Sequence, residues 1–184
     1  MVILDATTLL LLIDPKARPP LDPSTRKPLE RCKDRLEYLR DSLSEAGTRV
    51  VIPTPVLSEV LVGAGTARSQ YLTEITTSHA FLVAPFDVKA AVELSFLLDG
   101  GAKPAKRKLT RQETWAKVKF DRQIIAIARA NRIKDIYTDD GNLTSVATAN
   151  DVAVHHTWEL PLPPQKQQQE LNLPVPGDKD DKDA

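Results

Sequence analysis

MVILDATTLLLLI, the first thirteen residues, contains a pattern that recurs along the chain. Residues 2–4 form a short apolar run, Asp5 ends it, and two threonines lead into a second apolar run over residues 9–13. This order predicts a buried strand, a polar turn and a helix. Asp5 would then stand at the carboxyl end of the first strand, where open α/β sheets place their ligand crevice.

Short apolar runs alternate with helical patterns over the first 158 residues. Strands are expected at 2–4, 49–52, 80–84, 135–138 and 151–155. Helices are expected at 9–13, 29–46, 55–62, 67–78, 87–98 and 113–132. This alternation predicts an α/β fold, a three-layer sandwich with a central, mostly parallel sheet of four to five strands.

Glycine, threonine and proline mark helix boundaries in this pattern. Gly47 is expected to end the helix over 29–46, because glycine readily adopts the left-handed conformation that follows many helices. Thr54 can cap the next helix, with Pro55 in its first turn.

Proline also marks two segments that lie outside the alternation. Five prolines within residues 14–28 exclude a regular element and predict a surface insertion. From residue 159 the chain is rich in proline, glutamine and charge, which predicts a disordered tail over 159–184. The expected organisation is therefore one domain over 1–158 followed by that tail.

Composition limits the class of protein. The chain has 184 residues, 41% of them hydrophobic, so it can bury one core. Lys plus Arg and Asp plus Glu each number 25, and this zero net charge excludes a polycation that wraps nucleic acid. A single cysteine, Cys32, excludes an intrachain disulfide and zinc clusters built on cysteine. With no signal peptide or membrane span in the sequence, we expect a cytoplasmic location.

Several carboxylates stand apart from the charged surface pattern. Asp5 follows the first strand, and Asp139 and Asp140 follow a later one. Glu59 has valines three residues before and after it, which predicts that it points at least partly inward. Asp121 lies beside the apolar stripe of its helix. If these acids converge, their mutual repulsion requires a cation, and hard oxygen ligands favour Mg²⁺ or Mn²⁺.

Four stretches carry a family resemblance. They read VILDAT at 2–7, PVLSEV at 55–60, FDRQIIA at 120–126 and IYTDDGNL at 136–143. They resemble, in the same order, the four acidic motifs of PIN domains, and the resemblance covers about residues 1–158. It implies a metal-dependent nuclease, most often a ribonuclease. Many bacterial members are VapC-like toxins of type II toxin–antitoxin pairs, so it also implies an antitoxin partner and a homodimer.

The resemblance assigns roles to individual residues. Asp5, Glu59 and Asp121 match the first three acidic positions, and the fourth is Asp139 or Asp140. By this resemblance Asp5, Asp121 and one of the last two hold the metal, while Glu59 acts through water. Two hydroxyl positions match as well and would orient a metal-bound water or serve as turn hydroxyls; they are Thr7 and Thr138. The insertion and the tail are not features of the minimal toxin.

Positive charge gathers in one segment. Residues 103–122 hold eight basic and two acidic side chains, and the segment runs directly into Asp121. It predicts either contacts with the phosphate backbone of RNA or a solvated loop. The candidate RNA-binding residues are Lys106, Arg107, Lys108, Arg111, Lys119 and Arg122. His155 and His156 lack an acid or cysteine at ligand spacing, so we expect structural or surface roles for them.

Three functions are consistent with these residues. The first is an endoribonuclease that depends on Mg²⁺ or Mn²⁺. The second is a catalytically inactive PIN-like module that binds nucleic acid or protein, with its acids serving as caps and ion pairs. The third, a phosphoacceptor domain or another metal phosphohydrolase built on Asp5, leaves Glu59 and Asp121 unexplained.

Overall fold

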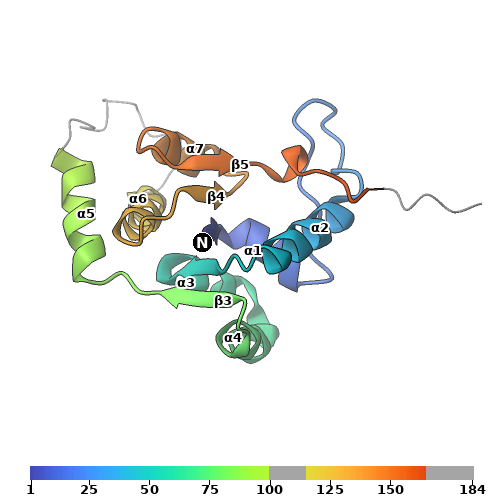
Figure 1. The fold of residues 1–184 in the computed structure, drawn as a ribbon, viewed down its shortest axis with the longest axis horizontal. Coiled ribbons are helices and arrows are strands. Elements are labelled where there is room, and N and C mark those ends of the chain that lie inside the picture. Colours follow the sequence, from blue (N-terminus) through green and yellow to red (C-terminus); the bar gives the residue numbers. More distant parts are fainter. Residues whose placement is uncertain (100–114, 165–184) are drawn as a thin grey trace, which may run out of the picture.

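The structure is a computed structural model that describes residues 1–99 and 115–164 (Figure 1). Its centre is a five-stranded sheet in which every neighbouring pair is parallel. The strands are β1 (Val2–Leu4), β2 (Val50–Pro53), β3 (Phe81–Ala84), β4 (Asp135–Tyr137) and β5 (Ala153–His155). Their order across the sheet is β3-β2-β1-β4-β5. The predicted α/β fold with a central parallel sheet is therefore confirmed.

Helices flank this sheet. They are α1 (Ala6–Ile13), α2 (Cys32–Glu45), α3 (Thr54–Gly63), α4 (Arg68–Thr77), α5 (Val88–Asp99), α6 (Trp115–Ala130) and α7 (Gly141–Thr148). Two short 3₁₀ turns complete the described elements, η1 (Gly65–Ala67) and η2 (Thr157–Glu159). No helix within residues 1–99 or 115–164 is both long and apolar enough to cross a membrane.

The main core lies between the sheet and the helices. Its fully buried side chains come from the central strands, such as Ile3 and Ile136, and from helices, such as Val60 and Ile125. A second, smaller cluster joins α2 to the chain after η2 through Leu29, Cys32, Leu36 and Leu160. This second cluster fixes η2 near the sheet, which matters for the site described below.

The chain enters α1 without the polar turn that the sequence predicted. Asp5 has extended backbone angles, and its carboxylate accepts a hydrogen bond from the Thr8 backbone N–H, so Asp5 is the N-cap and the helix begins at Ala6. The strand and the helix are therefore joined by a single residue. That residue is also the first candidate acid.

Two of the three predicted boundary roles are confirmed. Gly47 has a φ of +60° after α2, and the Thr48 N–H donates to the Leu43 carbonyl across it, as in a Schellman motif. Pro55 lies in the first turn of α3. Thr54 as a cap was wrong, because its hydroxyl accepts a hydrogen bond from the Phe86 N–H instead.

Helix α7 was not predicted. Its eight residues, GNLTSVAT, include one glycine, two threonines and a serine, which are weak helix formers and hide its apolar stripe. The N-cap Asp140 compensates by accepting hydrogen bonds from the Asn142 and Leu143 N–H groups. Residues 14–28 form no helix, and their pairing is limited to one isolated bridge between Leu21 and Pro28.

Candidate functional site

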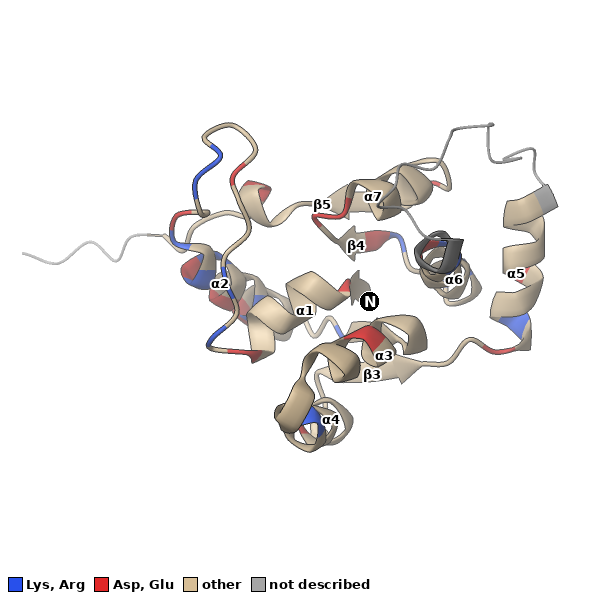
Figure 2. Ribbon diagram, turned by 180° about the vertical axis from the view of Figure 1, so that it is seen from behind, with Lys and Arg blue, Asp and Glu red and all other residues tan. Residues whose placement is uncertain are grey.

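The sheet changes direction between β1 and β4. After β1 the chain continues to β2 on one side, whereas after β4 it continues to β5 on the other side. Such a switch point leaves a crevice at the carboxyl ends of the two strands, where ligands bind in open α/β sheets. Asp5 follows β1 and residues 138–140 follow β4, so the two strand ends with acidic residues meet there. Figure 2 shows these acidic segments, in red, at the start of α1 and between β4 and α7.

Asp5 is the most buried acid of this crevice, with 5% of its surface exposed. Its Oδ1 accepts the Thr8 N–H over 2.7 Å, and its Oδ2 accepts the Thr138 hydroxyl over 2.5 Å. Burial raises the pKa of the Asp5 carboxyl, the charge of Asp139 adds to the rise, and the hydrogen bonds from Thr138 and Thr8 oppose it. The site therefore holds a carboxylate that is costly to ionise.

Thr138 connects the two strand ends. Its side chain is fully buried, and its hydroxyl donates to Asp5 while accepting the Asp140 backbone N–H over 3.0 Å. One hydroxyl thereby fixes the Asp5 carboxylate relative to the residues that follow β4. This contact spans 133 residues of sequence.

Asp139 and Asp140 have different local roles. Asp139 directs both carboxylate oxygens to Thr157: Oδ1 accepts the backbone N–H over 2.8 Å, and Oδ2 accepts the hydroxyl. Asp140 caps α7 with its Oδ1. The charge of Asp139 also contributes to the raised pKa of Asp5.

The two helix acids differ in exposure. Asp121, on α6, is buried, with 6% of its surface exposed, as its position beside the apolar stripe predicted. Glu59, on α3, is exposed, so the expectation that it points inward was wrong. The buried stripe of α3 runs through Val56 and Val60, whereas Val62, the other neighbour used to orient Glu59, is 73% exposed. Helix α3 nevertheless packs against both α1 and α6, which carry or follow the buried acids.

The two threonines after Asp5 also differ. Thr7, the residue singled out from the sequence, is exposed, whereas Thr8 is fully buried. The Thr8 hydroxyl has no hydrogen-bond partner among the described residues, although its backbone N–H binds Asp5. A polar atom buried without a partner is unusual in a folded protein. The spacing of three residues from a helix N-cap is the signal that could have identified Thr8.

The donor chemistry of these residues suits a hard divalent cation. An ionised carboxylate offers about four lone-pair positions, and the two hydrogen bonds to Asp5 leave its oxygens able to bind further. The ion pairs found among the described residues do not involve Asp5. No three Asp, Glu, His or Cys side chains gather closely enough to hold a metal in the part of the chain that the structure describes.

Most of the predicted RNA-binding residues are outside the described residues. Lys119 is exposed and Arg122 is half-buried on α6, the helix that carries Asp121. The others lie in the segment that the structure does not describe; these are Lys106, Arg107, Lys108 and Arg111.

Sequence reasoning missed the importance of η2. The His156 Nδ1 lies 2.7 Å from the Thr138 carbonyl oxygen, and the next residue, Thr157, holds Asp139. His155 bonds to Asp135 over 2.9 Å. The structural roles expected for both histidines are thus confirmed, but their contacts lie at the site. Their position at the carboxyl end of β5, at the same sheet edge as Asp5, is the signal that would have indicated this.

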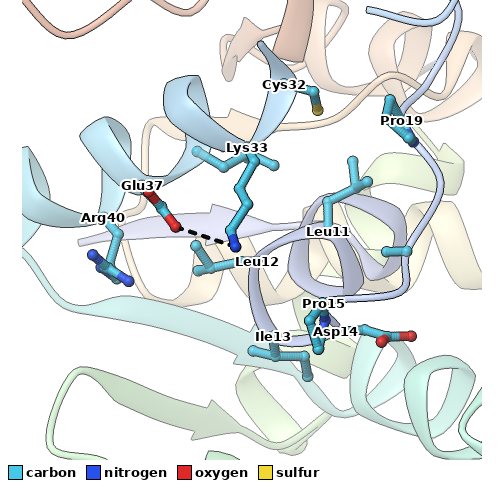
Figure 3. A pocket seen from close by; sticks show the side chains of 12 residues that line it. Leu11, Leu12, Ile13, Asp14, Pro15, Pro19, Cys32, Lys33, Glu37 and Arg40 are labelled. Carbon is cyan, nitrogen blue, oxygen red and sulfur yellow. Dashed lines mark ion pairs between the residues drawn. The ribbon is translucent and has the colours of Figure 1, made fainter.

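Two cavities lie away from these residues. One of about 230 Å³ opens between α1, α2 and the proline-rich segment, lined by Leu11, Pro19 and Cys32 among others (Figure 3). Another, of about 580 Å³, extends from Leu12 to the start of β3 at Phe81. Both reach the carboxyl end of α1, whereas Asp5 is at its amino end. Cys32 is 5% exposed and burial raises the pKa of its thiol, as expected for a core cysteine.

Comparisons with known proteins bear on the fold. The sequence matches no protein-family model. It also matches no curated protein. Among solved structures, the chain is similar to VapC20 of Mycobacterium tuberculosis, a toxin that cleaves the sarcin–ricin loop. The two are 12% identical, with a TM-score of 0.50 over 79% of this chain and 94% of that one. The chain thus has a PIN-domain, VapC-like fold.

Proposed function

We propose that this chain is a metal-dependent endoribonuclease that hydrolyses RNA phosphodiester bonds. The observation that carries the proposal is the buried Asp5 carboxylate, bonded to Thr138 at the switch point of a PIN-domain fold. An acid kept there without a cationic partner among the described residues is costly for stability. A catalytic requirement would explain why the chain keeps it.

Mg²⁺ or Mn²⁺ would be held by Asp5, Asp121 and either Asp139 or Asp140. When bound, the ion lowers the pKa of a coordinated water and offsets charge on the phosphate oxygens. Thr138 orients Asp5, and Thr157 orients Asp139, through the hydrogen bonds described above. Glu59 lies on the exposed side of α3, where it would act through water, and Thr7 would lie at the rim of the crevice.

The proposal is tested by incubating end-labelled RNA with the full chain in Mn²⁺, in Mg²⁺ or in excess EDTA. Asp5→Asn and Asp121→Asn should each reduce cleavage by at least about a hundredfold, because each removes a charged ligand. Asp41→Asn is the matched control, since Asp41 lies on the exposed surface of α2. Cleavage that persists in EDTA, or in Asp5→Asn, would refute the proposal.

A second candidate function is a catalytically inactive module that binds nucleic acid or protein. It is favoured by the exposure of Glu59 and by the finding that no three possible ligands gather in the described parts of the chain. Under this alternative, RNA binds with equal affinity with or without divalent metal and is never cleaved. The same assay, with a binding measurement added, distinguishes the two functions.

The partners we propose are RNA, an antitoxin and a second copy of the chain. The likeness to a toxin supports a toxin role, which growth arrest on induced expression would test.

For self-association, α2 is a poor candidate because Cys32 and Leu36 are buried within the protein. Helix α5, at the outer edge of the molecule (Figure 1), exposes Val88, Val92 and Phe96 at four-residue spacing. Light scattering of wild type and Phe96→Ser tests whether this stripe pairs two copies.

A further inference from the structure

Another cavity lies beside the candidate site and is not used by the proposed chemistry. Its volume is about 240 Å³, and its walls come from α2, the ends of β4 and β5, and η2. Four of its lining residues carry planar rings: Tyr38, Tyr137, His155 and His156. Two of the three tyrosines in the chain therefore line this cavity.

The rings are held in fixed positions. Tyr137 and His155 stack with ring centroids 4.8 Å apart and an angle of 27° between their planes. His156 stacks on Trp158 at 4.4 Å and 12°. Hydrogen bonds anchor the imidazoles, since His155 bonds to Asp135 and His156 to the Thr138 carbonyl. The cavity is therefore bordered by preorganised flat surfaces, which lowers the entropic cost of binding another flat group.

The cavity is linked to the acidic crevice through one residue. The Thr138 carbonyl is bonded to His156, which lines the cavity, while the Thr138 hydroxyl is bonded to Asp5. A polymer that carries planar groups on a charged backbone would fit this arrangement, with a planar group in the cavity and the adjoining backbone in the acidic crevice. RNA is such a polymer.

Polar groups at the cavity favour a base with hydrogen-bond donors. Glu159 and Ser42 are among the lining residues. Glu159 is exposed, and its Oε2 accepts the His156 backbone N–H over 3.4 Å, which leaves lone pairs of the carboxylate for a ligand. A carboxylate accepts hydrogen bonds from the exocyclic amino group of a base such as cytosine. Uracil lacks an amino group, so it is the natural comparison for cytosine.

We propose that this cavity binds a nucleobase of the RNA strand, next to the phosphodiester that is cleaved, and prefers a base with an amino group. The proposal rests on the proposed ribonuclease function for its placement on RNA. The base enters among the rings of Tyr38, Tyr137 and the two histidines, with its amino group toward Glu159. Stacking on an aromatic side chain is tolerant of sequence, so Glu159 supplies the discrimination.

Tryptophan fluorescence provides a test that does not depend on cleavage. The sequence has two tryptophans, so a Trp115→Phe background leaves Trp158, which stacks on His156, as the reporter. In EDTA, we expect CMP to change this fluorescence more strongly than UMP, and a cytosine-containing oligoribonucleotide to bind more tightly than CMP. If the cavity were a site for free nucleotides, it would bind CMP at least as tightly as the oligonucleotide. That result would overturn the proposal that the cavity binds a base of an RNA strand.

Tyr38 is half-buried on α2 and lies outside the main core, so replacing it tests the cavity without opening that core. Tyr38→Ala should weaken binding of the oligonucleotide about 5- to 150-fold, the range expected for one lost stacking contact. Tyr38→Phe keeps the ring and should bind within about twofold of wild type. Glu159→Gln should reduce the preference for CMP over UMP. Equal binding by wild type and Tyr38→Ala would overturn the proposal.

Cleavage assays separate failure of this proposal from failure of the ribonuclease function. If RNA is cleaved but Tyr38→Ala leaves KM and the cleaved sequence unchanged, the cavity has no role and the nuclease function stands. If no metal supports cleavage but binding still depends on Tyr38 and Glu159, the cavity is a base site in a protein that is not a nuclease. The predicted result is cleavage by both proteins, with KM raised in Tyr38→Ala.

Discussion

Thr138 joins separate parts of the candidate site through hydrogen bonds of its hydroxyl and its carbonyl. Its hydroxyl donates to the Asp5 carboxylate and accepts the Asp140 N–H, and its carbonyl binds His156. The side chain has no exposed surface, so water cannot replace these partners. This single residue therefore links Asp5, Asp140 and His156.

Thr138→Val should lower the free energy of unfolding by about 1–3 kcal/mol, because the similar shape keeps the packing while the buried Asp5 carboxylate and the half-buried Asp140 N–H each lose a partner. Denaturant unfolding measures this difference. Thr138→Ser keeps the hydroxyl and should recover most of the loss. A valine variant as stable as wild type would show that the Thr138 hydroxyl does not hold Asp5.

Asp5 gives the site a defined pH dependence. Its pKa is raised in the folded protein, so the folded state binds the proton more tightly than the unfolded state does. Protonation of Asp5 therefore contributes most to the free energy of unfolding below the ordinary aspartate pKa. This contribution is lost as the pH rises through the raised pKa of the folded protein. Asp5→Asn removes this loss. We expect its Tm to match or exceed that of wild type at pH 7, with the difference shrinking toward pH 4; a lower Tm at pH 7 would contradict the burial argument.

At the level of single residues, the sequence predicted the positions of the acids better than it predicted their hydrogen-bond partners. Asp5 and Asp121 are buried, as strand ends and apolar stripes indicated. Glu59 was misplaced because one of the two valines that oriented it is itself exposed. Thr157 was missed because its contact with Asp139 joins η2 to the end of β4. No local spacing encodes such a pairing.

Among the elements, η2 has the clearest functional consequence. It follows β5, packs against α2, and directs two donors from one residue, Thr157, at the Asp139 carboxylate. The second core cluster, through Leu36 and Leu160, keeps it there. This short turn thus positions a candidate metal ligand without being a ligand itself.

Thr157→Val removes the hydroxyl but keeps the shape and the backbone N–H. We expect kcat to fall by about 10- to 100-fold and the Mn²⁺ concentration for half-maximal rate to rise, as for other residues that orient a metal ligand. Thr157→Ser should restore both values. A fall in Tm with unchanged Mn²⁺ dependence would mean that Thr157 only stabilises the fold.

Element boundaries could be predicted where local chemistry is strong. Gly47 ends α2, since its positive φ suits glycine, and Pro55 starts α3. Helix α7 escaped prediction because its residues favour helix weakly and its stability depends on packing against α6 and β5. Thr54 was misassigned because a backbone donor on another loop competes for its hydroxyl.

For the whole molecule, topology and charge decide what can bind. The zero net charge gives no general attraction to RNA, so binding must come from a local basic surface. The alternation of strands and helices predicted the α/β class and the shared edge of Asp5 and Asp139. It did not predict the strand order, because β1 and β4 are separated by 130 residues and their pairing depends on the packed core.

The basic segment before α6 yields a salt-dependent prediction. Replacing Lys106, Arg107 and Lys108 with glutamine should weaken RNA binding most at low salt, because fewer counterions are released. The slope of log affinity against log salt should become shallower by about 2 if all three contact phosphates of single-stranded RNA. Fluorescence titration at several salt concentrations measures this slope. Weakening by the same factor at every salt concentration would exclude phosphate contacts.

The idea that the buried acids form one divalent-metal site is tested most directly by calorimetric titration of Mn²⁺ into the full chain. We predict saturable binding to wild type and to the surface control Asp41→Asn. Binding should be lost or at least about tenfold weaker in Asp5→Asn and in Asp121→Asn. Equal Mn²⁺ affinity in wild type and Asp5→Asn, or no binding to wild type, would contradict the idea that the buried acids form a metal site.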